Sequence, residues 1–131
     1  MEFIELNLEQ QCLTTKQIDN LLKLSWVQAL FYVRLHGDEQ VLQVETQSAQ
    51  FKQPNVLVWG SKYRGKTHEL VTQLALNLTL AISEHQQKKA ILLDPMAGRG
   101  TSLLWAARYG IDGYGIELDP MAAEHFERDV K

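Results

Sequence analysis

The sequence predicts an α/β protein with a pair of parallel strands, and three features after residue 89 support this. Ala90–Leu93 is a continuous apolar run, as expected of a parallel strand that is buried on both faces. A glycine-containing loop follows, and Ser102 to Tyr109 is predicted to be a helix, with Gly110 at its C-terminal end. Gly113 to Ile116 then has the composition of a second short strand. This order predicts one βαβ unit, whose crossover is expected to be right-handed.

Helices are predicted on both sides of this unit. Thr67 is expected to cap a helix, because a hydroxyl oxygen can accept a free backbone N–H of the first turn. The apolar face of that helix is expected to consist of Leu70, Val71, Leu74, Leu78, Ala81 and Ile82. A polar link over residues 85–89 leads into the first strand. Pro120 is expected to open a last helix, since proline is tolerated in the first helical turn.

Residues 1–60 are predicted to form a small N-terminal α/β segment, distinct from the glycine-richer residues 61–131. Its expected elements are a strand over residues 3–8, a helix capped by Thr14 or Thr15, a β-hairpin over residues 29–46 and a strand over Val56–Trp59. The apolar positions of that first helix are Ile18, Leu21, Leu22 and Trp26.

Composition excludes several classes of protein. The 131 residues fit one domain, with 45% hydrophobic and 22% charged residues. No apolar run approaches the roughly 20 residues that span a bilayer, so no membrane partner is expected, and the cytoplasm is the expected compartment. Cys12 is the only cysteine, which excludes a disulfide framework and a cysteine-rich zinc site, and no metal site is predicted. The net charge of −3 offers no overall electrostatic footprint for nucleic acid, although a local basic patch remains open.

The loop after the first strand has the residues that an adenosyl cofactor requires. Gly98 and Gly100 lack side chains, so the backbone can turn sharply and a ligand can approach it closely. Ligands of open α/β sheets bind outside the carboxyl ends of the strands. Glu117 closes the second strand, at a distance from the glycines that suits an acid accepting hydrogen bonds from ribose hydroxyls.

Two other nucleotide motifs are weighed against this interpretation. In the G-x-G-x-x-G dinucleotide pattern, Leu103 replaces the third glycine, which disfavours close helix–strand packing of the dinucleotide type. Gly60 to Thr67 matches the phosphate-binding P-loop pattern G-x-x-x-x-G-K-[ST] letter by letter. A P-loop needs a preceding strand, for which Val56–Trp59 is available, and Asp94 could nominally bind magnesium. The bulky residues 62–64 count against a P-loop, and we keep the P-loop only as an alternative.

The sequence around the loop resembles a known family. Leu93 to Thr101 looks like motif I of class I S-adenosylmethionine-dependent methyltransferases. Its D-P-x-x-G-x-G-T form is similar to the branch that methylates exocyclic amino groups or guanine of DNA and RNA, including the tRNA guanosine methyltransferases with THUMP domains. Tyr63 to Leu70 resembles motif X, and Gly115 to Asp119 resembles motif II. The resemblance covers roughly residues 61–125 and implies a partial Rossmann-like methyltransferase fold.

The resemblance implies S-adenosyl-L-methionine as cofactor and assigns residues to it. The implied cofactor-binding set is Arg64, Lys66, Thr67, Asp94, Pro95, Met96, Ala97, Gly98, Gly100, Thr101, Glu117 and Leu118. Asp94 and the backbone of residues 97–100 would surround the methionine part, and Thr101 would cap the helix near its carboxylate. Glu117 would bind the ribose, and Leu118 would pack on the adenine. The residues taken from motif X would approach the methionine carboxylate.

One departure from the family is large. Enzymes of this branch carry a catalytic [DNS]-P-P-[YFW] tetrapeptide, whereas the only prolines here are Pro54, Pro95 and Pro120. We therefore assign no catalytic residue, and expect an N-terminal fragment that is inactive alone. The intact enzyme is expected to act on tRNA, rRNA or DNA; the alternative is a non-catalytic module that binds the cofactor or a partner chain. An unpaired sheet edge is also expected to favour a homodimer.

Overall fold

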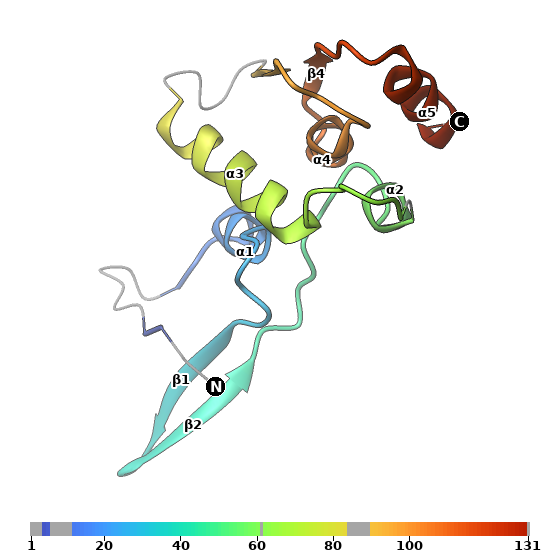
Figure 1. The fold of residues 1–131 in the computed structure, drawn as a ribbon. Coiled ribbons are helices and arrows are strands. Elements are labelled where there is room, and N and C mark those ends of the chain that lie inside the picture. The colour runs from blue at the N-terminus through green and yellow to red at the C-terminus, as the bar shows by residue number, and fades with distance from the viewer. Residues whose placement is uncertain (1–3, 6–11, 61, 84–89, 131) are drawn as a thin grey trace. The chain divides into compact units, whose positions relative to one another are not determined.

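The structure of this chain is a computed structural model that describes residues 4–5, 12–60, 62–83 and 90–130 (Figure 1). Over these residues it is a mixed α/β protein with five helices and two sheets of two strands each. The chain divides into two compact units. Unit 1 comprises residues 1–23 and 27–49, and unit 2 comprises residues 24–26 and 50–131. The expected boundary at residue 60 falls inside unit 2.

Unit 1 contains α1 (Thr15–Leu22) and a hairpin of β1 (Phe31–His36) and β2 (Glu39–Val44). The predicted cap is confirmed: the hydroxyl of Thr14 accepts the backbone N–H of Gln17, and the Gln17 side chain accepts that of Thr14 at 2.8 Å. The predicted hairpin is also confirmed, with antiparallel strands. The helix ends before Trp26, which was wrongly placed on it. The strand expected over residues 3–8 falls mostly outside the described residues.

The core of unit 2 is built around α4 (Thr101–Tyr109), which contacts α2 (Val56–Trp59), α3 (Glu69–Ile82) and both strands of the second sheet (Figure 1). Its buried apolar side chains are Val58, Leu76, Leu104 and Trp105. Tyr109 on α4 accepts hydrogen bonds from Gln73 and Asn77 of α3. This polar pair fixes which side of α3 faces α4.

The predicted strand over Val56–Trp59 is wrong, because these residues form the single turn α2. The backbone N–H of Trp59 donates to Asn55 O at 3.1 Å, and that of Gly60 donates to Val56 O at 2.8 Å. The run of β-formers predicted a strand. Helical geometry instead lets the fully buried Val58 pack into the core, and such packing overrides a propensity of at most ~1 kcal/mol per residue.

The predicted helix over α3 is confirmed, but its predicted apolar face and cap are wrong. The buried residues are Gln73 and Leu76, whereas the predicted face is exposed: Leu70, Val71, Leu74, Leu78, Ala81 and Ile82. The hydrogen bonds to Tyr109 turn the opposite side inward. The cap is His68 rather than Thr67, since the His68 side chain accepts the backbone N–H of Leu70 at 3.3 Å.

The second sheet confirms the predicted parallel pair. β3 (Ile91–Asp94) lies parallel to β4 (Asp112–Gly115), with α4 between them in the chain. The prediction that β3 is buried on both faces is wrong. Leu92 packs on the core, but Ile91 and Leu93 are 59% and 61% exposed. None of the described residues covers the other face of this two-stranded sheet. The polar link predicted over residues 85–89 lies outside the described residues.

Close packing of α4 on the sheet is achieved from the strand side. A Cβ on Gly113 would lie 3.0 Å from Leu103, and one on Gly115 would lie 2.8 Å from it. Leu103 therefore packs closely against the glycines of β4. The glycines of β4 supply the space that a third loop glycine supplies in the dinucleotide pattern.

Unit 2 ends in α5 (Pro120–Val130), which begins at Pro120 as predicted. Asp119 accepts the backbone N–H of Met121 at 3.0 Å and so caps its first turn. Within the described parts of the chain, no helix has the length and apolar character needed to cross a membrane.

Candidate functional site

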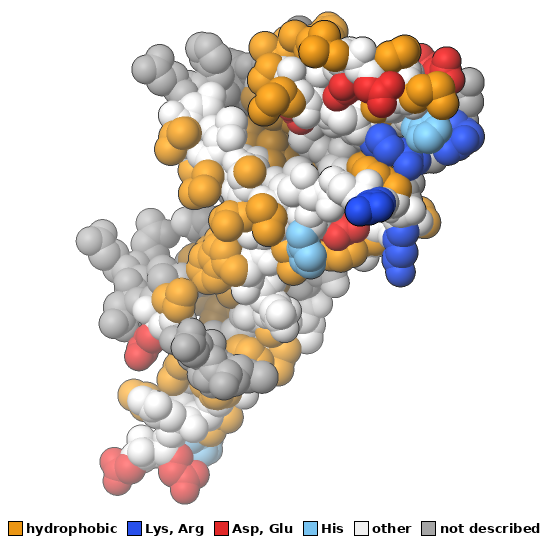
Figure 2. Space-filling view, viewed as in Figure 1, with side chains coloured by type: hydrophobic (Ala, Val, Ile, Leu, Met, Phe, Trp, Pro, Cys, Tyr) orange, Lys and Arg blue, Asp and Glu red, His pale blue; other side chains and the backbone are white. Residues whose placement is uncertain are grey.

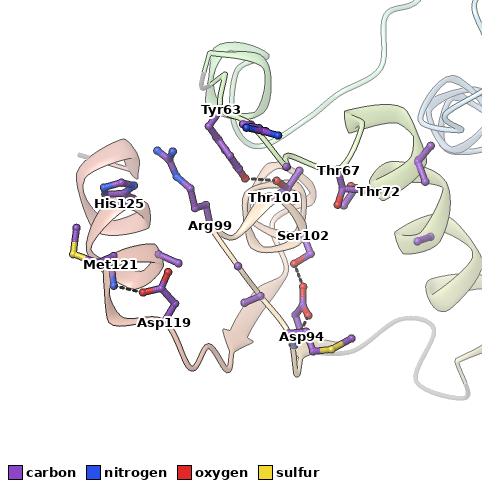
Figure 3. Close-up of a pocket in the computed structure, with 18 residues that line it drawn as sticks. Tyr63, Thr67, Thr72, Asp94, Arg99, Thr101, Ser102, Asp119, Met121 and His125 are labelled. Carbon is purple, nitrogen blue, oxygen red and sulfur yellow. Dashed lines mark hydrogen bonds between the residues drawn. The ribbon is translucent and has the colours of Figure 1, made fainter.

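A cavity of about 580 Å³ lies at the carboxyl end of β3, where the loops of unit 2 meet (Figure 3). Its walls come from the segment over residues 63–67, the first half of α3, the loop over residues 94–102 and the start of α5. The volume is within the range of small-molecule and cofactor sites. Segments far apart in the sequence thus converge at the place where α/β proteins bind ligands.

The loop after β3 is held by its own backbone and by one carboxylate. Asp94 accepts the Met96 backbone N–H at 3.0 Å and the hydroxyl of Ser102, which fixes the loop to the first turn of α4. Ile116 N donates to Asp94 O at 2.8 Å, and Ala97 N donates to Ile116 O at 2.9 Å. The loop therefore continues the ladder between the two strand ends and presents a fixed surface to the cavity.

The two loop glycines serve different purposes. Both have positive φ, 53° at Gly98 and 75° at Gly100, a region that favours glycine. A Cβ on Gly98 would meet no atom within 4 Å, so open space lies over it. A Cβ on Gly100 would lie 2.3 Å from the ring of Phe126 on α5. Gly98 thus meets the expected requirement for close ligand approach, whereas Gly100 allows α5 to pack against the start of α4.

Glu117 is bound to the edge of the same loop. Its carboxylate accepts the backbone N–H of Asp119 at 2.9 Å and that of Gly98 at 2.7 Å. These donors, Asp119 foremost, lower the pKa of Glu117 below its usual range. The neighbouring Leu118 is 96% exposed. An acid and an uncovered apolar side chain therefore lie side by side in the chain, next to the glycine loop.

The lowered pKa of Glu117 predicts a pH-dependent contribution to stability. The contribution is complete above the ordinary glutamate pKa of about 4.3 and is lost as the pH falls through the folded-state pKa, because the protonated acid is a poorer acceptor. We expect Glu117→Gln to lower the free energy of unfolding at neutral pH, and the difference from wild type to shrink in acid. Urea titrations from about pH 7 to about pH 3 measure it. A difference that does not change with pH contradicts this prediction.

The segment resembling motif X lies directly against the loop resembling motif I. The hydroxyls of Tyr63 and Thr101 are 3.0 Å apart, and Arg64 and Thr67 line the cavity. Lys66 does not line it. The Lys66 ammonium donates to the backbone oxygen of Val58 at 2.7 Å and pairs with the carboxylate of Glu69 at 2.7 Å, which lowers the pKa of Glu69.

This arrangement argues against the P-loop alternative. A P-loop requires a strand before its glycines, and α2 occupies that position. The lysine of the pattern, Lys66, is committed to Val58 and Glu69 rather than directed at a ligand. Residues 60–67 therefore match the phosphate-binding pattern in sequence but lack the preceding strand and the available lysine that phosphate binding requires.

Seven of the twelve sequence-assigned residues line the cavity: Arg64, Thr67, Asp94, Met96, Ala97, Gly98 and Thr101. The other five lie outside its walls: Lys66, Pro95, Gly100, Glu117 and Leu118. Glu117 nevertheless touches the cavity lining through its hydrogen bond to Gly98.

Several lining residues were not assigned from the sequence. Three of them lie within or beside the motifs: Tyr63, Arg99 and Ser102. Their positions next to assigned residues could have indicated them. Met121 and His125 lie four residues apart on α5, so they share one helix face, a spacing that sequence reasoning could have used.

Comparisons with models of protein families, with curated proteins and with solved structures found no match to this chain. Among the residues that the structure describes, no group of three or more His, Cys, Asp and Glu side chains could hold a metal ion. The lining of the cavity offers carboxylate, guanidinium, imidazole, hydroxyl and backbone groups.

Proposed function

We propose that this chain is the N-terminal, cofactor-binding portion of an S-adenosylmethionine-dependent methyltransferase that acts on RNA or DNA. One observation supports this most directly: the segment resembling motif X and the loop resembling motif I form the walls of a single cavity. Their hydroxyl contact, from Tyr63 to Thr101, joins them across it. If the two segments are motif X and motif I, they must lie together at one cofactor site.

The residues present fit such a cofactor. Arg64 and Asp94 bring opposite charges to the cavity, which suits the carboxylate and ammonium of an amino-acid group. Asp94 uses one oxygen for Met96 N and the other for Ser102, and Glu117 also accepts two bonds, so each carboxylate keeps further acceptor positions. The exposed Leu118 offers apolar surface for a purine. When bound, the cofactor supplies an electrophilic methyl group.

The role of these residues in the reaction is binding and orientation. Thr101 is the first residue of α4 rather than its cap, which is Gly100, and the N-terminal end of this helix together with the Thr101 hydroxyl can donate to an anionic group. No side chain here is assigned to the target nitrogen, because the sequence contains no [DNS]-P-P-[YFW] tetrapeptide. The same observation favours the second candidate, a non-catalytic cofactor-binding or protein-interaction module.

Calorimetry with S-adenosylhomocysteine tests the proposal. We expect binding to the full chain, weakened about tenfold by Arg64→Ala, because a charge-assisted hydrogen bond contributes roughly 1.5–3 kcal/mol. Lys62→Ala is the matched control, since Lys62 is exposed on the same segment but does not line the cavity. Binding of magnesium–ATP without binding of S-adenosylhomocysteine contradicts the proposal, as does the absence of heat with both ligands.

The uncovered sheet is the part of the proposal that concerns a partner chain. A parallel sheet is normally covered on both faces, yet Ile91, Leu93, Tyr114 and Ile116 are all more than half exposed. We infer that a second copy of the chain covers this sheet or its edge. Light scattering is expected to give the mass of two chains for the wild type and of one chain for Leu93→Glu. Ile4→Glu, at a similarly exposed residue outside both sheets, is the control; a one-chain mass for the wild type contradicts the inference.

A further inference from the structure

Arg99 is held in place at one side of the cavity. Its guanidinium lies 4.0 Å from the centre of the Tyr63 ring, a cation–π distance, and the Tyr63 hydroxyl lies 3.0 Å from that of Thr101. Figure 3 shows the Arg99 side chain pointing away from the loop, between Tyr63 and His125. A long side chain that is ordinarily flexible is thus oriented before any ligand arrives.

Acidic and basic side chains both line the cavity. Asp94 accepts hydrogen bonds from Met96 N and Ser102, and Asp119 accepts one from Met121 N as the cap of α5, so both carboxylates already have donors. Arg99 and His125 both line the wall toward α5. Arginine and histidine side chains can both donate hydrogen bonds to an anion, and a planar guanidinium matches the oxygens of a phosphate with two parallel N–H groups.

Positive charge continues from this wall along the surface. Lys62 and Arg64 are exposed on the segment that carries Tyr63. Figure 2 shows Lys and Arg side chains gathered on the same side of unit 2, with histidine beside them. Several cations on one side of unit 2, more than a single phosphate group requires, suit a polynucleotide backbone, although acidic side chains lie near them and the net charge of the chain is −3.

We propose that Arg99 and His125 form a phosphate subsite for a single-stranded polynucleotide, with Tyr63 as the residue that positions Arg99. The inference rests on the proposed function, because it adds to the cofactor cavity a contact for the nucleic-acid substrate. A single strand is specified because a base must leave its stack before its atoms can be methylated. The phosphate contact fixes where the strand lies and carries no base preference.

Fluorescence anisotropy with a labelled single-stranded RNA of roughly ten nucleotides tests the subsite. We expect Arg99→Ala to weaken binding about tenfold and to reduce the slope of log affinity against log salt by about 0.7, the value for one lost phosphate contact. Arg34→Ala, which removes an exposed arginine from β1, is the matched control and should leave both quantities unchanged. Equal affinity and slope for Arg99→Ala and wild type overturn the proposal.

Two substitutions at Tyr63 separate positioning from general destabilisation. Tyr63→Phe removes the hydroxyl contact with Thr101 but keeps the ring under the guanidinium, so RNA affinity should stay near that of the wild type. Tyr63→Leu removes the ring and should weaken RNA binding about threefold, as expected for an exposed cation–π pair. Equal RNA affinity for the two variants contradicts the positioning role.

Two further measurements identify the ligand and distinguish a failure of the phosphate subsite from a failure of the proposed cofactor-binding function. Inorganic phosphate at the ionic strength of a chloride control should not displace the RNA; selective displacement indicates a small-anion site and overturns the polynucleotide assignment. Circular dichroism and a urea titration compare the fold of Arg99→Ala with that of the wild type. If the variant does not fold, His125→Gln replaces it in the RNA assay. A chain that binds S-adenosylhomocysteine but no RNA overturns this inference alone, whereas failure to bind S-adenosylhomocysteine counts against the proposed function.

Discussion

Gly100→Ala is expected to lower the free energy of unfolding by about 3 kcal/mol, combining the cost of a left-handed backbone with overpacking. Gly100 is buried with φ of 75°, and an added Cβ would lie 2.3 Å from the Phe126 ring. The added methyl group must either displace α5 or disrupt the first turn of α4. Chemical denaturation of the variant measures the change, and the loss of S-adenosylhomocysteine binding should accompany it, because the cavity has walls from both helices.

Gly98→Ala is the matched control for this prediction. Gly98 also has positive φ, but a Cβ there would meet no atom within 4 Å, so only the backbone cost of about 1 kcal/mol remains. Adding Phe126→Leu to Gly100→Ala should recover part of the lost stability, because the smaller side chain gives way to the methyl group. Equal destabilisation by the two alanine substitutions would show that packing against α5 is not the cause.

Trp105→Ala is expected to destabilise the chain by about 4 kcal/mol, the usual cost of removing a buried aromatic side chain. Trp105 is 2% exposed and contacts the rings of Phe51 and Tyr109. Its indole N–H has no hydrogen-bond partner among the described residues, so the loss arises from ring packing and from the contact with the Arg108 guanidinium, 5.8 Å from the ring centre. A small protein is stable by only about 5–15 kcal/mol, and the variant should therefore be largely unfolded by mild denaturant.

Trp59→Ala provides the comparison, since Trp59 is 40% exposed at the end of α2. We expect this second substitution to cost about 1 kcal/mol, in the range of ordinary surface changes. Urea titrations followed by circular dichroism measure both variants without relying on tryptophan emission. A cost at Trp59 that equals the cost at Trp105 contradicts the placement of the core around α4.

Elements whose signals lie within a few residues could be predicted from the sequence. The cap at Thr14, the hairpin within residues 29–46 and the helix end at Gly110 each depend on neighbouring residues. The parallel pairing of β3 and β4 followed from the spacing that a crossover helix requires. The cavity residues in the loop after β3 were likewise indicated by the requirement for glycine and acid at a strand end.

Predictions failed where a distant contact decides between two local choices. Val56–Trp59 has strand-forming residues, yet burial of Val58 beside α4 makes the segment a helix. The apolar stripe of α3 predicted the buried face, whereas the face that packs inward carries Leu76 together with Gln73 and Asn77, which donate to Tyr109. Neither Tyr109 nor its partners carried a signal in the local sequence, because their relation exists only after the helices pack.

The candidate site divides in the same way. The sequence by itself predicted a glycine loop at the end of the first strand and an acid, Glu117, after the second, since both depend on backbone conformation and strand order. That Gly98 is free of neighbours whereas Gly100 lies against Phe126 was decided only by the tertiary structure. Only the tertiary structure decided that Lys66 is committed to Val58 and Glu69, and that Arg99 lies on Tyr63. The physical reason is that local conformation depends on neighbours in the chain, whereas the direction of a long charged side chain depends on whichever partner the fold brings near.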